Sequence, residues 1–281
     1  MDTYIGHHIN TFHGFVSTVN FAKSIGANFF QIFLSSPKSY TVTNHTDKEM
    51  QELANELTKN KMKIVVHGNY MLNFCNSVES DIHKKAITHL KHDLNESVKI
   101  GAIGVVIHMG KKLKLSEEEA FNNYVSGVKS VLAQTTHSTI IFETGAGVGT
   151  EICTSLPDLK KLYDSFTKEE QDRIMFCIDT CHIFSSGYDI GDVDYVDTFD
   201  KLIKETLTWE KISCIHLNDS KHKCDCKKDC HADITKGNIN TEGLKKFTKL
   251  CAANKVAIVL ETPCENLTKK EQITLVKEWV K

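Results

Sequence analysis

The stretch KIVVH, residues 63–67, is a short apolar, β-branched run that ends in a histidine. Similar runs recur along the chain and start about 25 to 45 residues apart, which leaves room for a loop and a helix after each one. Runs that are apolar throughout, without alternation, are typical of parallel strands covered on both faces. The eight runs are YIGHHI (4–9), FFQIFL (29–34), KIVVH (63–67), GVVIH (104–108), TIIFE (139–143), MFCID (175–179), SCIHL (213–217) and AIVLE (257–261).

The segments between these runs have helical patterns. Residues 47–61 carry apolar side chains at i, i+3, i+4 and i+7, and residues 116–134 open with Ser116 and Glu119, the spacing of a capping box. Eight strands that alternate with helices predict an α/β fold, a (β/α)8 TIM barrel that forms a single domain over residues 1–281. An open, doubly wound parallel sheet is the structural alternative.

The composition excludes several protein classes. A formal net charge of −2 over 281 residues argues against a protein that coats nucleic acid non-specifically. The opening MDTYIGHHIN lacks the basic start and apolar core of a signal peptide, and no apolar run approaches the roughly 20 residues that span a bilayer. We therefore expect an intracellular, reducing setting without membrane contact, in which most of the ten cysteines are small buried hydrophobes.

The carboxyl ends of the last six runs each carry a histidine or a carboxylate. A single histidine there is usually a hydrogen-bonded core residue, and a single carboxylate often caps the next helix. Six together are harder to explain in that way, because a buried charge must be paired or coordinated. In a barrel, all these ends emerge on the same face. The pattern therefore predicts one metal centre built from His67, His108, Glu143, Asp179, His216 and Glu261.

Three further residues, in two segments, extend this ligand set. His182 follows Asp179 by three residues, and Asp229 and His231 form an Asp-x-His pair after the seventh run. Zinc takes about four ligands, so nine nitrogen and oxygen donors indicate two or three clustered divalent ions. Clustered divalent ions suit phosphoryl chemistry. The mixture of histidine and carboxylate favours Zn²⁺, with Mn²⁺ or Fe²⁺ as substitutes.

The stretch CDCKKDCHADI, residues 224–234, allows another interpretation. Cys224, Cys226 and Cys230 have C-x-C and C-x3-C spacing, whereas a structural zinc knot usually pairs C-x2-4-C with a second such pair. Two alternatives stay open here. One is a non-catalytic DNA-binding module organised by these thiols, and the other is a reversible disulfide among them. A disulfide would lie beside the Asp-x-His pair and could perturb it.

With these residues in place, the chain resembles the endonuclease IV family of apurinic/apyrimidinic (AP) endonucleases over nearly its whole length. The motifs that carry the resemblance are CIDTCHIFSSGYD (177–189), HLNDSK (216–221), LETP (260–263) and the Asp-x-His spacing. The resemblance implies a zinc-dependent DNA-repair enzyme with three zinc ions per chain, which cleaves duplex DNA 5′ to an abasic site and leaves a 3′-hydroxyl. It implies three ligand sets: His67, His108 and Glu143; Glu143, Asp179, His216 and Glu261; and His182, Asp229 and His231.

Within these sets, the resemblance implies that Glu143, Asp179 and Glu261 are the catalytic carboxylates. It also implies that Lys38, Tyr70 and Met71 contact DNA and help to expose the abasic nucleotide. The expected partner is double-stranded DNA that contains abasic sites, bound by a monomer. The expected location is with the DNA, in the cytoplasm or nucleus, or in a virion for a viral protein.

The sequence departs from the family pattern at several positions near the expected site. Lys38 stands where an arginine is common, Val148 replaces a polar side chain, and Cys230 stands between the two residues of the Asp-x-His pair where an arginine is usual. All nine expected ligands are retained. These departures concern the grip on DNA and the preference among lesions.

A sugar isomerase or epimerase on a related barrel is the alternative enzyme. Such enzymes use one divalent ion held by a Glu, Asp, His, Glu set, which this chain offers in Glu143, Asp179, His216 and Glu261. The other five expected ligands would then have no role.

Overall fold

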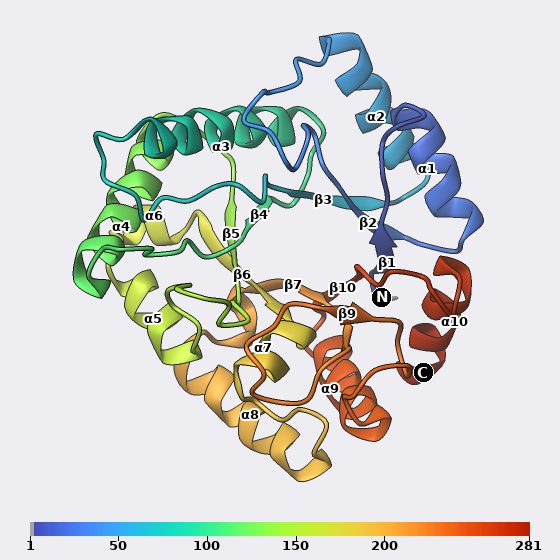
Figure 1. Cartoon of the computed structure of the whole chain (residues 1–281). Coiled ribbons are helices and arrows are strands. Elements are labelled where there is room, and N and C mark those ends of the chain that lie inside the picture. Colours follow the sequence, from blue (N-terminus) through green and yellow to red (C-terminus); the bar gives the residue numbers. More distant parts are fainter. Residues whose placement is uncertain (1–2) are drawn as a thin grey trace.

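A computed structural model describes residues 3–281 and contains a closed barrel of eight parallel strands (Figure 1). The strand order around the barrel is β1-β10-β7-β6-β5-β4-β3-β2, so each strand pairs with its sequence neighbours and the first pairs with the last. The TIM-barrel prediction is confirmed, and the open sheet is excluded. The barrel strands are β1 (Ile5–His8), β2 (Phe29–Ile32), β3 (Lys63–His67), β4 (Val105–Ile107), β5 (Ile140–Glu143), β6 (Ile174–Asp179), β7 (Ile212–His216) and β10 (Ala257–Leu260).

Helices surround the barrel and cover the outer faces of its strands (Figure 1). Their inward stripes are apolar, as in α2, where Met50, Leu53 and Leu57 are buried. The helices are α1 (Phe15–Ser24), α2 (Asp47–Lys59), α3 (Asp81–Lys99), α4 (Glu117–Ala133), α5 (Leu156–Asp164), α6 (Lys168–Gln171), α7 (Thr180–Ser186), α8 (Val193–Thr206), α9 (Thr241–Ala253) and α10 (Lys269–Trp279), with a 3-10 turn at Trp209–Lys211. Among residues 3–281, no helix has the length and apolar character needed to cross a membrane.

The capping box predicted at the start of α4 forms only in part. The Ser116 hydroxyl accepts a hydrogen bond from the Glu119 amide at 3.1 Å. The return bond from the Ser116 amide to the Glu119 carboxylate, which would complete the box, is absent from this described segment. Complete capping boxes instead open α2, α6 and α10, where a threonine stands at the N-cap position.

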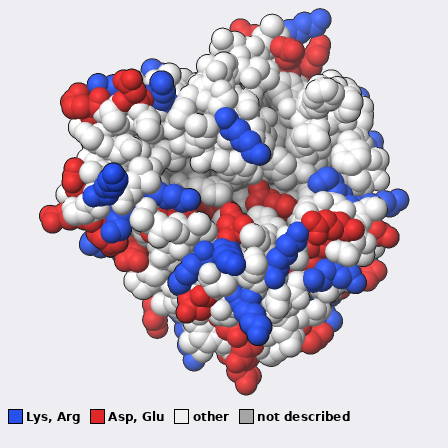
Figure 2. Space-filling model, viewed as in Figure 1, with Lys and Arg blue, Asp and Glu red and all other residues white. Residues whose placement is uncertain are grey.

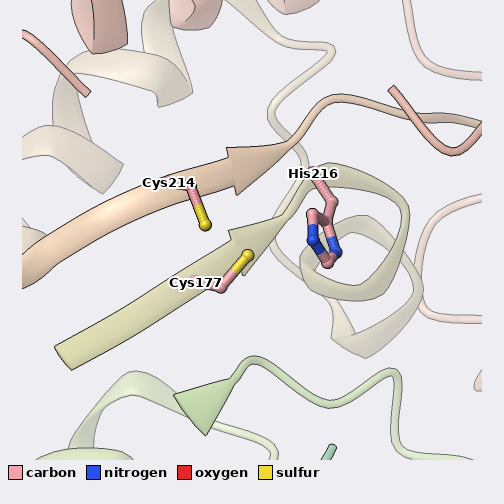
Figure 3. Close-up of side chains that lie close together, drawn as sticks. All are labelled: Cys177, Cys214 and His216. Carbon is pink, nitrogen blue, oxygen red and sulfur yellow. The ribbon is translucent and has the colours of Figure 1, made fainter. Parts of the chain in front are cut away.

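Side chains inside the barrel lie in layers of different polarity. The apolar layer consists of Phe29, Val65, Val106, Ile141, Cys177, Cys214, Ala257 and Val259. Cys177 and Cys214 are paired neighbours on β6 and β7, and Figure 3 shows them with His216 farther along β7. Asp179 and His216 form the next inward-facing pair, two residues farther along the same strands. The apolar layer therefore supports a polar layer at the carboxyl ends of the strands. Six of the ten cysteines are buried, which confirms that most of them pack as small hydrophobes.

A short antiparallel pair that the sequence did not predict follows β7. It consists of β8 (Asp219–Ser220) and β9 (His231–Ala232), with Ser220 opposite His231. We call residues 219–239, which contain both strands, the β8–β9 excursion. The buried Asp219 carboxylate accepts hydrogen bonds from the amides of Gly237 at 2.9 Å and Ile239 at 3.0 Å, which joins the two ends of this excursion. The segment between the two strands, residues 221–230, carries Asp229 back to the barrel mouth.

Candidate metal centre

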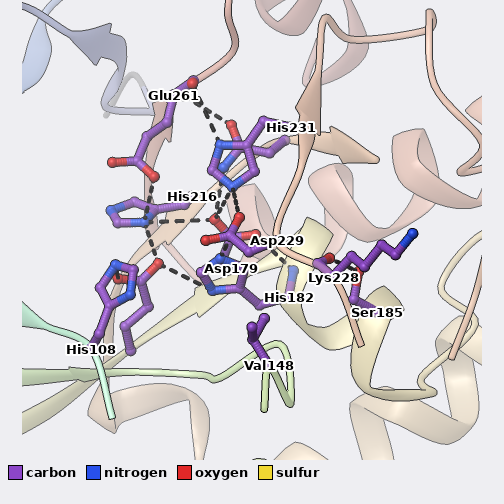
Figure 4. A network of polar contacts seen from close by, with 12 residues as sticks. His108, Val148, Asp179, His182, Ser185, His216, Lys228, Asp229, His231 and Glu261 are labelled. Atoms are coloured by element: carbon purple, nitrogen blue, oxygen red, sulfur yellow. Dashed lines mark hydrogen bonds and ion pairs between the residues drawn. The ribbon is translucent and has the colours of Figure 1, made fainter. Parts of the chain in front are cut away.

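The nine predicted ligands converge at the carboxyl ends of the barrel strands. Figure 4 labels His108, Asp179, His182, His216, Asp229, His231 and Glu261 among them. The residues from β3, β5, β6 and β7 are buried, as is His182 at the start of α7. Asp229 is the most accessible, with 39% of its side chain exposed. Residues separated by up to 194 positions in the sequence, from His67 to Glu261, therefore form one compact group, as the barrel topology predicts.

Glu143 lies at the centre of the group and turns its two oxygens toward different histidines. Oε2 lies 3.4 Å from Nε2 of His67 and 3.1 Å from Nε2 of His108. Oε1 lies 2.8 Å from Nδ1 of His216. A carboxylate in this position is suited to bridge two cations, one on each side.

His216 presents Nδ1 to three carboxylates. Besides Glu143, the oxygens of Glu261 and Asp179 lie 3.1 Å and 3.8 Å from this nitrogen. Gln31 holds the other side of the ring, since its Oε1 lies 2.8 Å from Nε2 of His216 while its amide donates to Glu261 at 2.6 Å. The pattern of strand ends did not indicate Gln31, although a glutamine in the run FFQIFL was a visible exception to its apolar character.

Asp229 joins the remaining two histidines. Its Oδ1 lies 3.1 Å from Nε2 of His182 and 3.2 Å from Nε2 of His231. His231 is also 3.5 Å from Oδ2 of Asp179, which connects this set to the previous one. The three sets thus form a continuous cluster in which each carboxylate contacts at least one imidazole.

Backbone carbonyls determine which ring nitrogens of His67 and His182 carry no hydrogen. Nδ1 of His67 lies 2.7 Å from the Gly68 carbonyl, and Nδ1 of His182 lies 2.9 Å from the Thr144 carbonyl. A carbonyl only accepts, so each Nδ1 carries hydrogen, and Nε2 of the neutral ring is a bare lone pair. These buried Nε2 atoms have no hydrogen-bond partner in the described structure, and neither does the Glu143 oxygen that faces His67.

A lone pair that faces a carboxylate is repulsive unless a cation or proton lies between them. Burial disfavours the charged imidazole, yet the carboxylates of Asp179 and Asp229 outweigh it and raise the pKa of His231 to about 9. Glu261 and Glu143 likewise hold the pKa of buried His216 well above its usual range. The cluster therefore attracts positive charge, and its nitrogen and oxygen donors fit divalent metal ions.

Comparisons with known proteins agree with the fold and the motifs. Residues 19–281 match the family described as xylose isomerase-like TIM barrel. A relative named as a putative endonuclease 4, from Acanthamoeba polyphaga mimivirus, is 39% identical over 295 residues that cover 100% of this chain and 95% of the relative. The chain belongs to the endonuclease IV family. The family resemblance predicted from the sequence is thereby confirmed.

Solved structures agree with this assignment at the level of fold. Endonuclease IV from Thermus thermophilus superposes with a TM-score of 0.82 at 24% identity, covering 99% of this chain and 98% of that one. A D-tagatose 3-epimerase-like protein superposes with a TM-score of 0.73 at 14% identity, covering 98% and 97%. The barrel fold is therefore shared with an epimerase-like protein, and the fold alone does not separate the two activities.

In this endonuclease IV family member, the candidate metal centre opens into two adjoining cavities. One, of about 270 Å³, is lined by Tyr70, Lys111, Asp229 and the ligands His108, His182, His231 and Glu261. The other, of about 310 Å³, shares Tyr70 and Lys111 with the first cavity and also includes Met71 and Val148. Figure 2 shows acidic side chains in the central hollow with lysines around it. A polyanionic substrate would thus meet lysines at the rim and the ligand cluster below.

Tyr70 and Met71 lie at this opening, with exposed fractions of 48% and 45%, and Lys38 lies on a neighbouring loop. The Tyr70 ring is edge-on to those of His67 and His108, at centroid distances of 5.2 and 5.5 Å. Its amide donates to the Pro37 carbonyl at 3.1 Å, which joins the two loops. Their contact with DNA stays a prediction.

The three clustered cysteines remain thiols, since residues 3–281 contain no disulfide. Cys224, Cys226 and Cys230 are partly buried, and the Cys226 sulfur lies 3.4 Å from the Ser185 hydroxyl. A reversible disulfide among them stays a prediction. Cys181, which the sequence did not single out, lies close to Asp179 and His231. Burial raises its pKa to about 12, so it is a neutral thiol beside the cluster.

Proposed function

We propose that this chain is an AP endonuclease that hydrolyses the phosphodiester 5′ to an abasic site in duplex DNA and leaves a 3′-hydroxyl, with three Zn²⁺ ions per chain. The observation that carries the proposal is the set of buried imidazole nitrogens, bare and aimed at carboxylates, within a member of the endonuclease IV family. Nine nitrogen and oxygen donors exceed the needs of one ion.

The ligand sets follow the contacts in the cluster. They are His67, His108 and Glu143; Glu143, Asp179, His216 and Glu261; and His182, Asp229 and His231. When bound, clustered divalent ions supply a nucleophile at neutral pH and neutralise charge on the phosphate and the leaving oxygen. This chemistry requires no serine or cysteine nucleophile.

The residues of the chain hold this arrangement in place. Glu143, Asp179 and Glu261 supply the negative charge that concentrates cations at the strand ends, and they are the catalytic carboxylates of the proposal. Gln31 fixes the ring of His216 through Nε2, so that Nδ1 faces the carboxylates. Outer partners of this kind orient ligands and tune their basicity.

The proposed substrate is duplex DNA in which one base is missing. Tyr70 and Met71 present an aromatic ring and a flexible apolar side chain at the opening, where they can replace stacking that the abasic site has lost. Lys38 on the adjoining loop offers a positive charge to a phosphate. Because one base is absent, exposing the damaged nucleotide costs less than flipping an intact one.

A cleavage assay tests the proposal directly. The substrate is a duplex oligonucleotide with one tetrahydrofuran residue, a stable abasic analogue, and the matched control is the same duplex without it. We expect a single cut 5′ to the analogue, a product that DNA polymerase extends, and loss of cutting with a chelator. Metal analysis of the purified chain should give three zinc ions. Equal cutting of both duplexes, or cutting that a chelator leaves unchanged, would contradict the proposal.

The same measurements separate the epimerase alternative. An isomerase would need only Glu143, Asp179, His216 and Glu261 around one ion. It leaves unexplained the Asp229 oxygen that lies within 3.2 Å of two imidazoles. One ion per chain, together with turnover of a ketose and none of abasic DNA, would favour the isomerase.

A further inference from the structure

A second buried polar group lies behind the loops at the barrel mouth and contains no predicted metal ligand. It consists of His89 and Asp93 on α3, both of which are 1% exposed. Nδ1 of His89 lies 3.2 Å from Oδ2 of Asp93, a charge contact without hydrogen-bond geometry, and Nδ1 of His92 lies 3.4 Å from the other carboxylate oxygen. Burying such a pair is costly unless its polar atoms find partners.

The partner of His89 outside α3 is Asn69, on the loop after β3. The Asn69 amide nitrogen lies 3.3 Å from Nε2 of His89. An amide nitrogen only donates, so Nε2 must be the bare nitrogen and the ring hydrogen must be on Nδ1, facing Asp93. The Asp93 carboxylate therefore favours the tautomer that Asn69 requires. A carboxylate near one ring nitrogen of a histidine commonly fixes the tautomer of the ring in this way.

Asn69 in turn joins two loops. Its amide nitrogen donates to the Ser36 carbonyl at 3.1 Å and to the Ser39 carbonyl, and its side-chain oxygen accepts from the Met71 amide at 2.7 Å. The Tyr40 hydroxyl also donates to the Met71 carbonyl. One side chain thus fixes residues 36–39, which include Lys38, to the turn that presents Tyr70 and Met71.

We propose that His89 and Asp93 are positioning residues that hold, through Asn69, the two loops carrying the proposed DNA contacts. The inference rests on the proposed function for its effect on DNA, whereas its effect on the loops does not. The Asn69 amide has two hydrogens and three acceptors nearby, namely Nε2 of His89 and the Ser36 and Ser39 carbonyls. Removing the His89 acceptor leaves the Ser36 and Ser39 carbonyls and the Met71 amide as the remaining partners of the Asn69 side chain, so its orientation is held less strongly and the two loops become more mobile.

A matched pair of substitutions separates this role from simple packing. His89→Leu keeps an apolar side chain of similar bulk in the buried site and removes the acceptor. His89→Gln places an amide oxygen near the position of Nε2 and retains it. We expect His89→Leu to raise KM for the abasic duplex about tenfold, the effect of losing one buried hydrogen bond, with kcat changed less than about twofold. His89→Gln should recover most of the loss, and zinc content should match wild type in both variants.

Hydrogen exchange provides a readout that is independent of activity. In His89→Leu, peptides spanning 36–40 and 69–71 should exchange faster, while peptides from β5 and β6 should not change. Unchanged exchange in these loops together with unchanged KM would overturn the inference, as would equal effects of Leu and Gln. If wild type itself does not cut abasic DNA but His89→Leu loosens the loops, the proposed function fails and the positioning role stands.

Should His89→Leu fail to fold, Asn69→Ala removes the same link from the loop side. It should give the same faster exchange and the same rise in KM without loss of zinc. Loops that exchange at the wild-type rate in Asn69→Ala would overturn the inference equally.

Discussion

At the residue scale, Glu143 has the most demanding position in the cluster, because its two oxygens face His67 and His108 on one side and His216 on the other. Its carboxyl pKa is held well below its usual range, since the neighbouring histidines outweigh the effect of burial. Removing this one charge removes the shared partner of three imidazoles.

Glu143→Gln tests that position. The amide is nearly isosteric but carries no charge, so we expect zinc content to fall and turnover on the abasic duplex to drop roughly 10³-fold, as for loss of a major electrostatic group in an active site. Single-turnover cleavage and metal analysis measure the two effects. Glu278→Gln, a change of the same kind on the exposed side of α10, is the control and should behave as wild type. Full zinc with near-normal cleavage in Glu143→Gln would remove Glu143 from the centre.

Gln31 makes a second prediction at this scale. It is fully buried, and it contacts both His216 and Glu261 without being an expected ligand. Gln31→Leu should leave the nine ligands in place but weaken metal binding roughly 10- to 100-fold, the usual cost of losing an outer partner. Competition with a chromophoric chelator measures that affinity. An unchanged affinity would show that the ring of His216 needs no support.

At the element scale, the strands explain why so much of the site was predictable. A parallel strand buried on both faces must be apolar, so a histidine or carboxylate at its end stands out, as His67 does in KIVVH. Closure of the barrel then brings all these ends together. The position of His182 was equally predictable, because it follows Asp179 by three residues. In the structure, Asp179 caps α7 and His182 lies in the first turn of that helix.

Other parts of the site have no periodic pattern of apolar residues in the sequence that could have predicted them. The β8 and β9 strands are two residues each, too short for an alternating pattern, so only the Asp-x-His spacing indicated where that segment returns. Asn69 and His89 are joined by a contact between a loop and a helix, which depends on tertiary packing that no single segment encodes. The convergence of the nine expected ligands was thus predictable from the sequence, whereas the hydrogen bonds around them were not.

The β8–β9 excursion gives a prediction at this scale. A Cβ added at Gly237 would clash with Oδ1 of Asp219 and with the Ser220 carbonyl oxygen, so one of them must move. Gly237→Ala should therefore displace the segment that carries Asp229 and His231, and leave the strand ligands in place. We expect two zinc ions per chain instead of three and much slower cleavage, measured by metal analysis and the duplex assay. Retention of all three ions would show that the excursion adapts to the methyl group.

At the scale of the whole molecule, the proposed metal ions and protons would compete for the same cluster. In the chelated protein, His231 has a folded-state pKa of about 9, raised from 6.5. Its contribution to stability is therefore fully present below pH 6.5 and is lost as the pH rises through 9. The zinc-loaded protein behaves oppositely, because ions bind better once the imidazoles have lost their protons.

The difference in melting temperature between zinc-loaded and chelated protein should therefore widen as the pH rises from about 6 to about 9. An ion at about 100 times its Kd stabilises the fold by about 2.7 kcal/mol, which corresponds to several degrees in a protein of this size. Thermal melts at matched ionic strength, with and without chelator, measure the difference. A gap that stays constant or narrows over this range would mean that the histidines do not exchange protons for metal.

The distribution of positive charge decides how this molecule can hold DNA. Arg173 is its single arginine, and it donates to the carbonyls of Leu132, Thr135 and Ser138 at 2.8 to 3.0 Å, so it supports the barrel instead of a ligand. With its single arginine committed to the barrel, cationic contacts to phosphate would have to come from lysines, and Lys38 is the one proposed here.

Affinity for abasic duplex should accordingly fall linearly with the logarithm of salt concentration. Lys38→Ala should reduce the slope by about one and weaken binding at low salt, because one phosphate contact releases about one counterion. Lys38→Arg keeps the charge, so it should keep the slope, and its planar fork can tighten binding where the lysine gives only a point contact. Fluorescence anisotropy across a salt series measures all three slopes, with Glu143→Gln present in all three proteins to slow cleavage and with their zinc content matched. If Lys38→Ala left the slope unchanged, the loop between β2 and α2 would lie outside the bound DNA, and other lysines around the hollow would have to supply the grip.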